Sequence, residues 1–208
     1  MKDLSHIHRF VPGRDSRRTP LLLLHGTGGD EADLLPLGSA LSPGASLLSP
    51  RGRVLENGMP RFFRRLQEGV FDQEDVMRRA AELAAFVSDA REAYGLAAPI
   101  AVGFSNGANI AAAMLMLHPE ALAGAVLLRA MTPLKNPPAA SLPRTPVLIL
   151  SGAQDPIVPA ADVAGLAAVL RDAGAEVAHK TLPTGHTLTQ MDVTLATQWF
   201  EERSTLAT

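Results

Sequence analysis

The chain has 208 residues, of which 19 are Lys or Arg, 21 are Asp or Glu and none is Cys. The lack of cysteine excludes disulfide frameworks, thiolate metal sites and cysteine nucleophiles. A formal net charge of −2 supplies no basic field for a phosphate backbone or an anionic bilayer, so we expect no nucleic acid and no membrane as partners. Residues 1–12 contain no signal-peptide core, which predicts a cytoplasmic protein, and the length favours one domain over residues 1–208.

Seven runs of the chain are typical of β-strands, and helical patterns separate most of them. The expected strands are residues 6–11, 21–24, 46–49, 100–103, 124–128, 147–150 and 176–182. The first run alternates in polarity, as an edge strand does, and most of the others are short apolar runs, as strands covered on both faces are. This order predicts an α/β fold with a mostly parallel central sheet of about seven strands and helices on both faces.

The clearest helix is expected at residues 73–94, with Asp72 as its N-cap and Gly95 as its C-terminal stop. Its apolar residues are spaced by three and four positions, which gives it one buried face. Two further helices are expected at residues 160–173 and 188–202.

Residues 51–71 break this order, because they hold five arginines, Pro60 and three phenylalanines without a clear period. We expect a loop with at most a short helix there. Seven strands and their helices use the rest of the length, which predicts that there is no separate cap domain.

The segment Gly103-Phe104-Ser105-Asn106-Gly107 fits the G-x-S-x-G pattern of a nucleophile elbow. An apolar strand precedes it and an alanine-rich helix follows it, so Ser105 stands at the strand-to-helix corner that this pattern requires. The glycines permit a strained turn that lifts the serine hydroxyl above the sheet. The alternative is a glycine-rich turn with an ordinary helix-capping serine.

A serine hydroxyl needs an imidazole base that a carboxylate holds in the correct tautomer. Asp155 directly follows a predicted strand, whereas the other acidic residues that we considered after Ser105 do not. His186 lies in a loop beyond the last strand, whereas His179 lies inside that strand. We therefore expect Asp155 and His186 to complete a catalytic triad; the alternatives are a turn-forming aspartate and a surface or helix-capping histidine.

The glycine-rich turn that follows strand 21–24 can expose backbone N–H groups to an oxyanion. Thr27 is the expected donor there, and the N–H of Asn106, at a helix start, is the second. His25 in the same turn is expected to be structural. A phosphate-binding loop is the rival interpretation, but no Lys follows these glycines and their spacing is not G-x-G-x-x-G.

Over nearly its whole length the chain resembles the α/β-hydrolase superfamily and, within it, the phospholipase/carboxylesterase family of small serine esterases. The resemblance is carried by residues 24–30, 103–108, 152–159 and 185–186. It implies a triad of Ser105, Asp155 and His186, hydrolysis of carboxylic esters and sometimes thioesters, no cofactor, and often a homodimer. Many relatives carry Gln and two glycines after the nucleophile, whereas this chain has Asn106, Gly107 and Ala108, so their substrates do not transfer directly.

Residues 50–65 look like a signature of bacterial esterases, and they follow the third predicted strand, at the edge where ligands bind in open α/β sheets. Here Arg51 or Arg61 would hold an anionic substrate group. Three apolar residues of the segment would wall an acyl or aryl pocket, and one further residue would lie at its rim. The wall residues are Met59, Phe62 and Phe63, and the rim residue is Met131. The alternative is a solvated loop whose arginines form ion pairs with Glu56, Glu68 and Asp72.

Together these patterns predict a serine hydrolase that cleaves small carboxylic esters through an acyl-enzyme, with a small-molecule ester as its partner. Thioesterase or lysophospholipase activity on the same triad is the alternative within enzymes, and a ligand-binding protein that kept the fold without catalysis is the alternative outside them. We expect no metal, because His6 and His8 share a strand face without a third ligand nearby.

Overall fold

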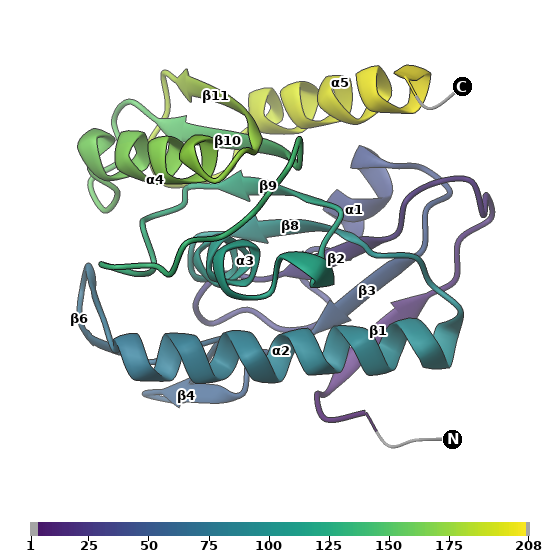
Figure 1. Ribbon diagram of the computed structural model, residues 1–208, viewed down its shortest axis with the longest axis horizontal. Helices are drawn as coiled ribbons and strands as arrows, with labels where there is room; N and C mark the ends of the chain where they lie inside the picture. The colour runs from purple at the N-terminus through teal and green to yellow at the C-terminus, as the bar shows by residue number, and fades with distance from the viewer. Residues whose placement is uncertain (1–3, 207–208) are drawn as a thin grey trace.

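A computed structural model describes residues 4–206 and is built around a seven-stranded sheet (Figure 1). Six strands are parallel, and β1 lies antiparallel to β3 at one edge. In spatial order the strands are β1 (His8–Val11), β3 (Leu47–Pro50), β2 (Leu21–Leu24), β8 (Ile100–Phe104), β9 (Gly124–Leu128), β10 (Pro146–Gly152) and β11 (Glu176–Leu182). The strand order reverses direction beside β2, and open α/β sheets bind ligands at such a point.

Helices cover both faces of the sheet (Figure 1). The larger core joins it to α2 (Gln73–Tyr94), α3 (Asn106–Leu117) and α4 (Ala160–Asp172). The smaller core joins it to α1 (Leu35–Leu41) and α5 (Gln190–Leu206), and a 3₁₀ turn, η1 (Pro119–Ala121), follows α3. Successive leucines of β2 enter the two cores alternately, which explains why this strand is apolar throughout.

The seven predicted strands are confirmed to within two residues at either end. Helix α2 has the predicted bounds and caps: the Asp72 carboxylate accepts a hydrogen bond from the N–H of Asp75 at 3.2 Å. Gly95 ends the helix in the left-handed region, at φ 65°, and its N–H bonds to the carbonyl of Arg91. The other two predicted helices are present, with α5 beginning two residues later and extending further than expected.

The prediction of a loop at residues 51–71 is wrong. Two hairpins stand there, β4 (Val54–Glu56) with β5 (Met59–Arg61) and β6 (Arg65–Gln67) with β7 (Val70–Phe71). Strands of two or three residues are too short to show an alternating pattern, but the Asn57-Gly58 turn is a hairpin signal, with both residues at positive φ.

Helix α1 was not expected either, because Pro36 and Gly38 obscure its seven residues.

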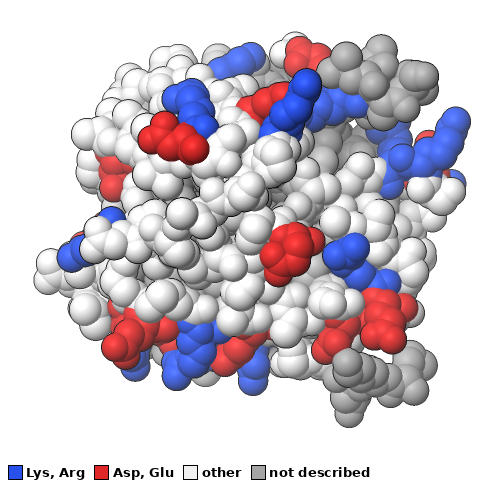
Figure 2. All heavy atoms as spheres, in the orientation of Figure 1, with Lys and Arg blue, Asp and Glu red and all other residues white. Residues whose placement is uncertain are grey.

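No helix within residues 4–206 is long and apolar enough to cross a bilayer. On the face drawn in Figure 2, acidic and basic side chains are interspersed. This mixture follows from the nearly balanced numbers of the two kinds of charge.

We predict opposite effects of alanine at two glycines whose Cβ positions are both open. Gly95→Ala should lower the free energy of unfolding by about 1 kcal/mol, because alanine is strained at positive φ. Gly165→Ala, on the exposed face of α4, should raise it by roughly 0.5 to 1 kcal/mol, because alanine favours a helix. Urea unfolding measures both, and a stabilised Gly95→Ala variant would contradict the left-handed cap.

Candidate active site

Ser105 occupies the corner between β8 and α3 in a strained conformation, with φ 51° and ψ −114°. Its own N–H bonds to the carbonyl of Leu128 at 2.8 Å, which fixes the corner to the neighbouring strand. A Cβ on Gly107 would overlap the carbonyl oxygen of Leu24, and one on Gly103 would lie 2.6 Å from the nitrogen of Ala108. Both glycines of the pattern are therefore needed for close packing of the backbone.

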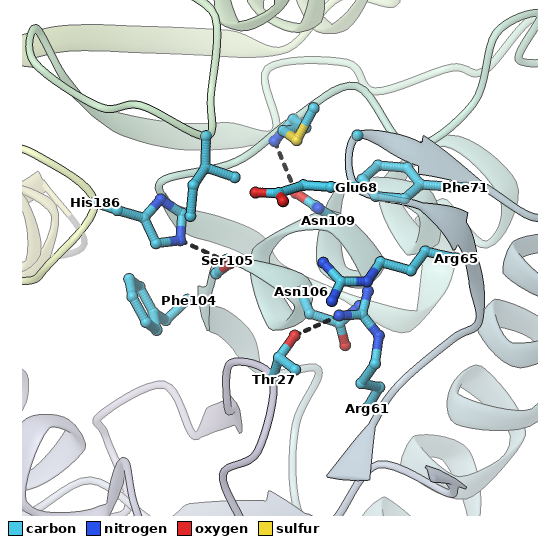
Figure 3. A pocket seen from close by; sticks show the side chains of 13 residues that line it. Thr27, Arg61, Arg65, Glu68, Phe71, Phe104, Ser105, Asn106, Asn109 and His186 are labelled. Atoms are coloured by element: carbon cyan, nitrogen blue, oxygen red, sulfur yellow. Dashed lines mark hydrogen bonds between the residues drawn. The ribbon is translucent and has the colours of Figure 1, made fainter. Parts of the chain in front are cut away.

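The structure brings the three predicted triad residues together at the carboxyl ends of β8, β10 and β11. Ser105 Oγ lies 2.9 Å from Nε2 of His186, and Nδ1 of His186 lies 2.8 Å from Oδ2 of Asp155 (Figure 3 shows the first contact). The side chain of Asp155 is 1% exposed, and its other oxygen accepts the N–H groups of Ile157 and Val158 at 2.8 and 3.1 Å. Four hydrogen bonds thus hold the carboxylate and the ring in one orientation: two from the backbone to Asp155, one between Asp155 and His186, and one between His186 and Ser105.

Two backbone N–H groups of residues around this cavity have no partner among the described residues. One belongs to Thr27, in the turn after β2, and the other to Asn106, the first residue of α3. Both residues line the cavity that holds Ser105. Free N–H groups at a helix start favour negative charge, so this pair has the chemistry of an oxyanion hole.

His25 has a structural position, as the sequence predicts. Gly52 donates its N–H to Nε2 of His25 at 2.9 Å, and Nδ1 donates to the carbonyl of Gly26 at 2.7 Å. Burial lowers the pKa of His25, which keeps the ring neutral. The ring therefore ties the turn carrying Thr27 to the segment that follows β3.

Sequence reasoning missed Arg129, which is fully buried at the end of β9. Its Nε donates to the carbonyl of Gly185 at 2.9 Å, and its Nη2 donates to the carbonyl of Thr187 and to Oγ1 of Thr184, both at 3.1 Å. These contacts lie on both sides of His186. Arg129 is thus a positioning residue for the loop that carries the histidine; the available signal was an arginine directly after an apolar strand.

The charge of Arg129 is paired with Asp192 of α5, whose carboxylate accepts bonds of 2.7 and 2.9 Å. Asp192 is 2% exposed and also accepts the N–H and hydroxyl of Thr189. A further bond joins Arg129 to the carbonyl of Leu150. A buried ion pair is tolerated when the other donors and acceptors of both side chains have partners. Here all three guanidinium nitrogens and both carboxylate oxygens are hydrogen-bonded.

The cavity beside Ser105 has a volume of about 260 Å³. Its apolar lining comes from Phe71, Phe104, Met131 and Ile157, and its polar lining includes Arg61, Arg65, Glu68 and Asn109 (Figure 3). The two hairpins of residues 54–71 supply most of one wall.

Four of the six predicted pocket residues do not line this cavity. Arg51 pairs with Glu31 at 2.5 Å outside it. Met59 packs over Gly28, and Phe62 and Phe63 are buried in the larger core. Phe62 and Phe63 lie in the bend between the two hairpins, and there both rings turn into the core rather than toward the cavity.

Arg61 and Met131 do line the cavity. Burial lowers the pKa of Arg61, which is 3% exposed. Sequence reasoning missed three further lining residues, Arg65, Glu68 and Phe71. Their position in the cavity wall depends on the second hairpin, which the sequence did not indicate.

Comparisons with known proteins agree with this architecture. A model of the family described as Phospholipase/Carboxylesterase matches residues 6–202. The protein named Putative hydrolase MhqD, from Bacillus subtilis (strain 168), is 46% identical over 184 residues, which is 88% of this chain and 92% of that protein. The crystal structure of a Bacillus cereus carboxylesterase is similar with a TM-score of 0.93 and 45% identity, covering 95% of this chain and 94% of that one. The structure of YahD with malic acid is similar with a TM-score of 0.90 and 31% identity, covering 95% and 98%.

We predict that Arg129→Lys lowers kcat for ester hydrolysis roughly 10- to 100-fold with a smaller change in KM. Lysine keeps the charge that Asp192 needs but cannot reach both sides of the histidine loop, and misplacement of a catalytic group by about 1 Å costs about this much. Arg171→Lys is the matched control, because Arg171 is exposed and its guanidinium donates to the carbonyl of Val177 on the surface. Steady-state kinetics on folded protein, checked by thermal unfolding, measures both, and an unchanged kcat in Arg129→Lys would refute the positioning role.

Proposed function

Because the chain belongs to the phospholipase/carboxylesterase family and is a carboxylesterase-type hydrolase, we propose that it cleaves small carboxylic esters at Ser105 through an acyl-enzyme. The observation that carries the proposal is the pair of short contacts from Ser105 to His186 and from His186 to Asp155. Nucleophile, base and orienting carboxylate are within hydrogen-bond reach of one another, as this chemistry requires.

In the first half of the reaction, Nε2 of His186 takes the proton of Ser105 while Oγ bonds to the ester carbonyl carbon. The N–H groups of Thr27 and Asn106 stabilise the negative oxygen of the tetrahedral intermediate. His186 then gives its proton to the leaving alcohol as the ester bond breaks. Asp155 keeps the proton on Nδ1 and stabilises the imidazolium.

In the second half, His186 takes a proton from water, whose oxygen bonds to the acyl carbon of the acyl-enzyme. Collapse of this second intermediate releases the carboxylic acid and returns the proton to Ser105. The net reaction consumes one water and forms one acid and one alcohol, without a change of oxidation state.

The size and polarity of the cavity support small substrates. Its volume of about 260 Å³ lies just below the usual range of ligand pockets, and arginine, glutamate and asparagine side chains interrupt its apolar lining. A long acyl chain would leave these polar groups without water, which disfavours a lysophospholipase. The structure of the relative YahD was determined with malic acid, and this small polar molecule agrees in kind with the substrates proposed here.

We predict that Ser105→Ala lowers kcat/KM for 4-nitrophenyl acetate by about 10⁴-fold or more, and that Asp155→Asn lowers kcat by about 10⁴-fold. The first variant removes the nucleophile and the second favours the wrong tautomer of His186. Steady-state release of nitrophenol measures both effects.

The matched control is Ser151→Ala, because Ser151 Oγ also lies 2.9 Å from a histidine nitrogen, that of His179. This second pair is within the sheet, Ser151 is 5% exposed, and within residues 4–206 no carboxylate bonds to His179. A fluorophosphonate should label the wild type and Ser151→Ala but not Ser105→Ala. Labelling that survives in Ser105→Ala would refute the proposed nucleophile.

A further inference from the structure

The cavity wall opposite His186 presents mainly hydrogen-bond donors, from Arg61, Arg65 and Asn106 (Figure 3). We propose that this wall is an anion subsite and that the preferred substrates are small esters that also carry a carboxylate group. The inference deepens the proposed function and rests on ester hydrolysis at Ser105.

Arg61 is held firmly with part of its guanidinium unused. Nε donates to the carbonyl of Phe63 at 3.2 Å, and Nη1 donates to Oγ1 of Thr27 at 2.5 Å. Nη2 makes no hydrogen bond to the described part of the chain, and the residue lines the cavity. A rigid guanidinium with one unused nitrogen is suited to a carboxylate, to which Nη2 can donate a charge-assisted hydrogen bond.

The positive charge in this wall exceeds the negative charge that neutralises it. Arg61 lies 3.4 Å and Arg65 2.6 Å from the carboxylate of Glu56, so two cations share one anion. Arg65 points its Nε to the same oxygen of Glu56, at 2.8 Å. The three residues together keep one uncompensated positive charge beside the nucleophile, and a substrate carboxylate would neutralise it.

Asn106 adds an independent sign that a ligand belongs here. Its Oδ1 accepts the N–H of Phe62 at 2.7 Å, which fixes the orientation of the amide and makes Nδ2 the free end. Nδ2 is buried without a hydrogen-bond partner, although the residue is only 2% exposed and lines the cavity. Buried donors are rarely left unpaired, so an acceptor from a bound ligand is the expected partner.

Among residues 4–206, Glu68 is the one carboxylate that lines the cavity, and its charge opposes the binding of an anion. Its side chain is exposed, and within residues 4–206 it has no ion pair with Arg61 or Arg65. Water therefore screens its charge far more than the charge of the buried Arg61. Glu68 should weaken anion binding slightly. Replacing it by Gln should therefore strengthen anion binding, whereas replacing an arginine of the wall should weaken it.

The contact between Arg61 and Thr27 sets the distance between the ester carbonyl and the carboxylate of the proposed substrate. The backbone N–H of Thr27 is the proposed oxyanion donor, and its side chain bonds to Arg61. A carboxylate on this wall would thus lie only a few bonds from the ester carbonyl. Monoesters of short dicarboxylic acids fit this description on the acyl side, and esters of short hydroxy acids fit it on the alcohol side.

The test compares two esters of equal shape, 4-nitrophenyl succinate as the free acid and 4-nitrophenyl 4-methylpentanoate, in which an isopropyl group replaces the carboxylate. The wild type should prefer the charged ester by about tenfold or more in kcat/KM, because charge-assisted hydrogen bonds are strong. The acetate ester of glycolic acid, as the free acid, and isobutyl acetate, in which an isopropyl group replaces the carboxylate, form the alcohol-side arm. Preference on either arm supports the subsite and identifies the side, and preference on neither overturns it.

Arg65→Gln should lower the charged-to-neutral ratio of kcat/KM by about tenfold, because it removes one of the two positive charges that share Glu56. The variant leaves Arg61 and its contact with Thr27 in place. Arg64→Gln is the matched control: Arg64 neighbours Arg65, is exposed and pairs with Asp72. Its ratio should equal that of the wild type, and Glu68→Gln should raise the ratio slightly. A folded Arg65→Gln variant with the wild-type ratio would contradict the proposal.

Binding without turnover separates failure of the subsite from failure of the proposed function. Titration calorimetry on Ser105→Ala should show that monomethyl succinate binds at least about tenfold tighter than methyl 4-methylpentanoate. Turnover that depends on Ser105 without this difference would overturn the subsite alone. Loss of turnover with every ester would overturn the proposed function, and the calorimetric comparison would still decide the subsite.

Discussion

The corner between β8 and α3 packs backbone to backbone against the end of β2, because no side chain fits between them at Gly107. This contact places the turn that carries Thr27 beside Ser105, in the same cavity. The first N–H of α3 has no partner among the described residues, because a helix offers no acceptor to its own first N–H groups. The position of the strained serine relative to the two donors therefore depends on one close approach, and a single added methyl group at Gly107 would disturb it.

His186 follows β11, which is an edge strand of the sheet, and buried polar contacts fix its position beside the corner that carries Ser105. Arg129 joins the end of β9 to both sides of His186 and to α5 through Asp192. Such a pair costs desolvation energy, and it is retained where complete hydrogen bonding specifies one geometry. Asp155 is fixed in a similar way by two N–H groups of its own turn.

The hairpins give the cavity its chemical character. They are too short to be stable alone, and the burial of Phe62 and Phe63, in the bend between them, anchors both to the larger core. With these rings turned inward, Arg61 and Arg65 line the cavity that holds Ser105. The same packing that anchors the hairpins thus removes two aromatic rings from the cavity and leaves two arginines in its wall.

Patterns that depend on neighbours in the chain were visible in the sequence by itself: the seven strands, the caps of α2, the serine corner, and the family to which they belong. Spacing and strand ends also indicated Asp155 and His186, because parallel strands bring their carboxyl ends to one edge. Pairing of the arginines of residues 51–71 with Glu56 was one of the two expected outcomes, but only the tertiary structure decided that Arg65 lines the cavity and that Arg129 holds the histidine loop, more than 50 residues away. Such contacts join segments whose relative position depends on packing, and no local pattern records which buried charge will meet which partner.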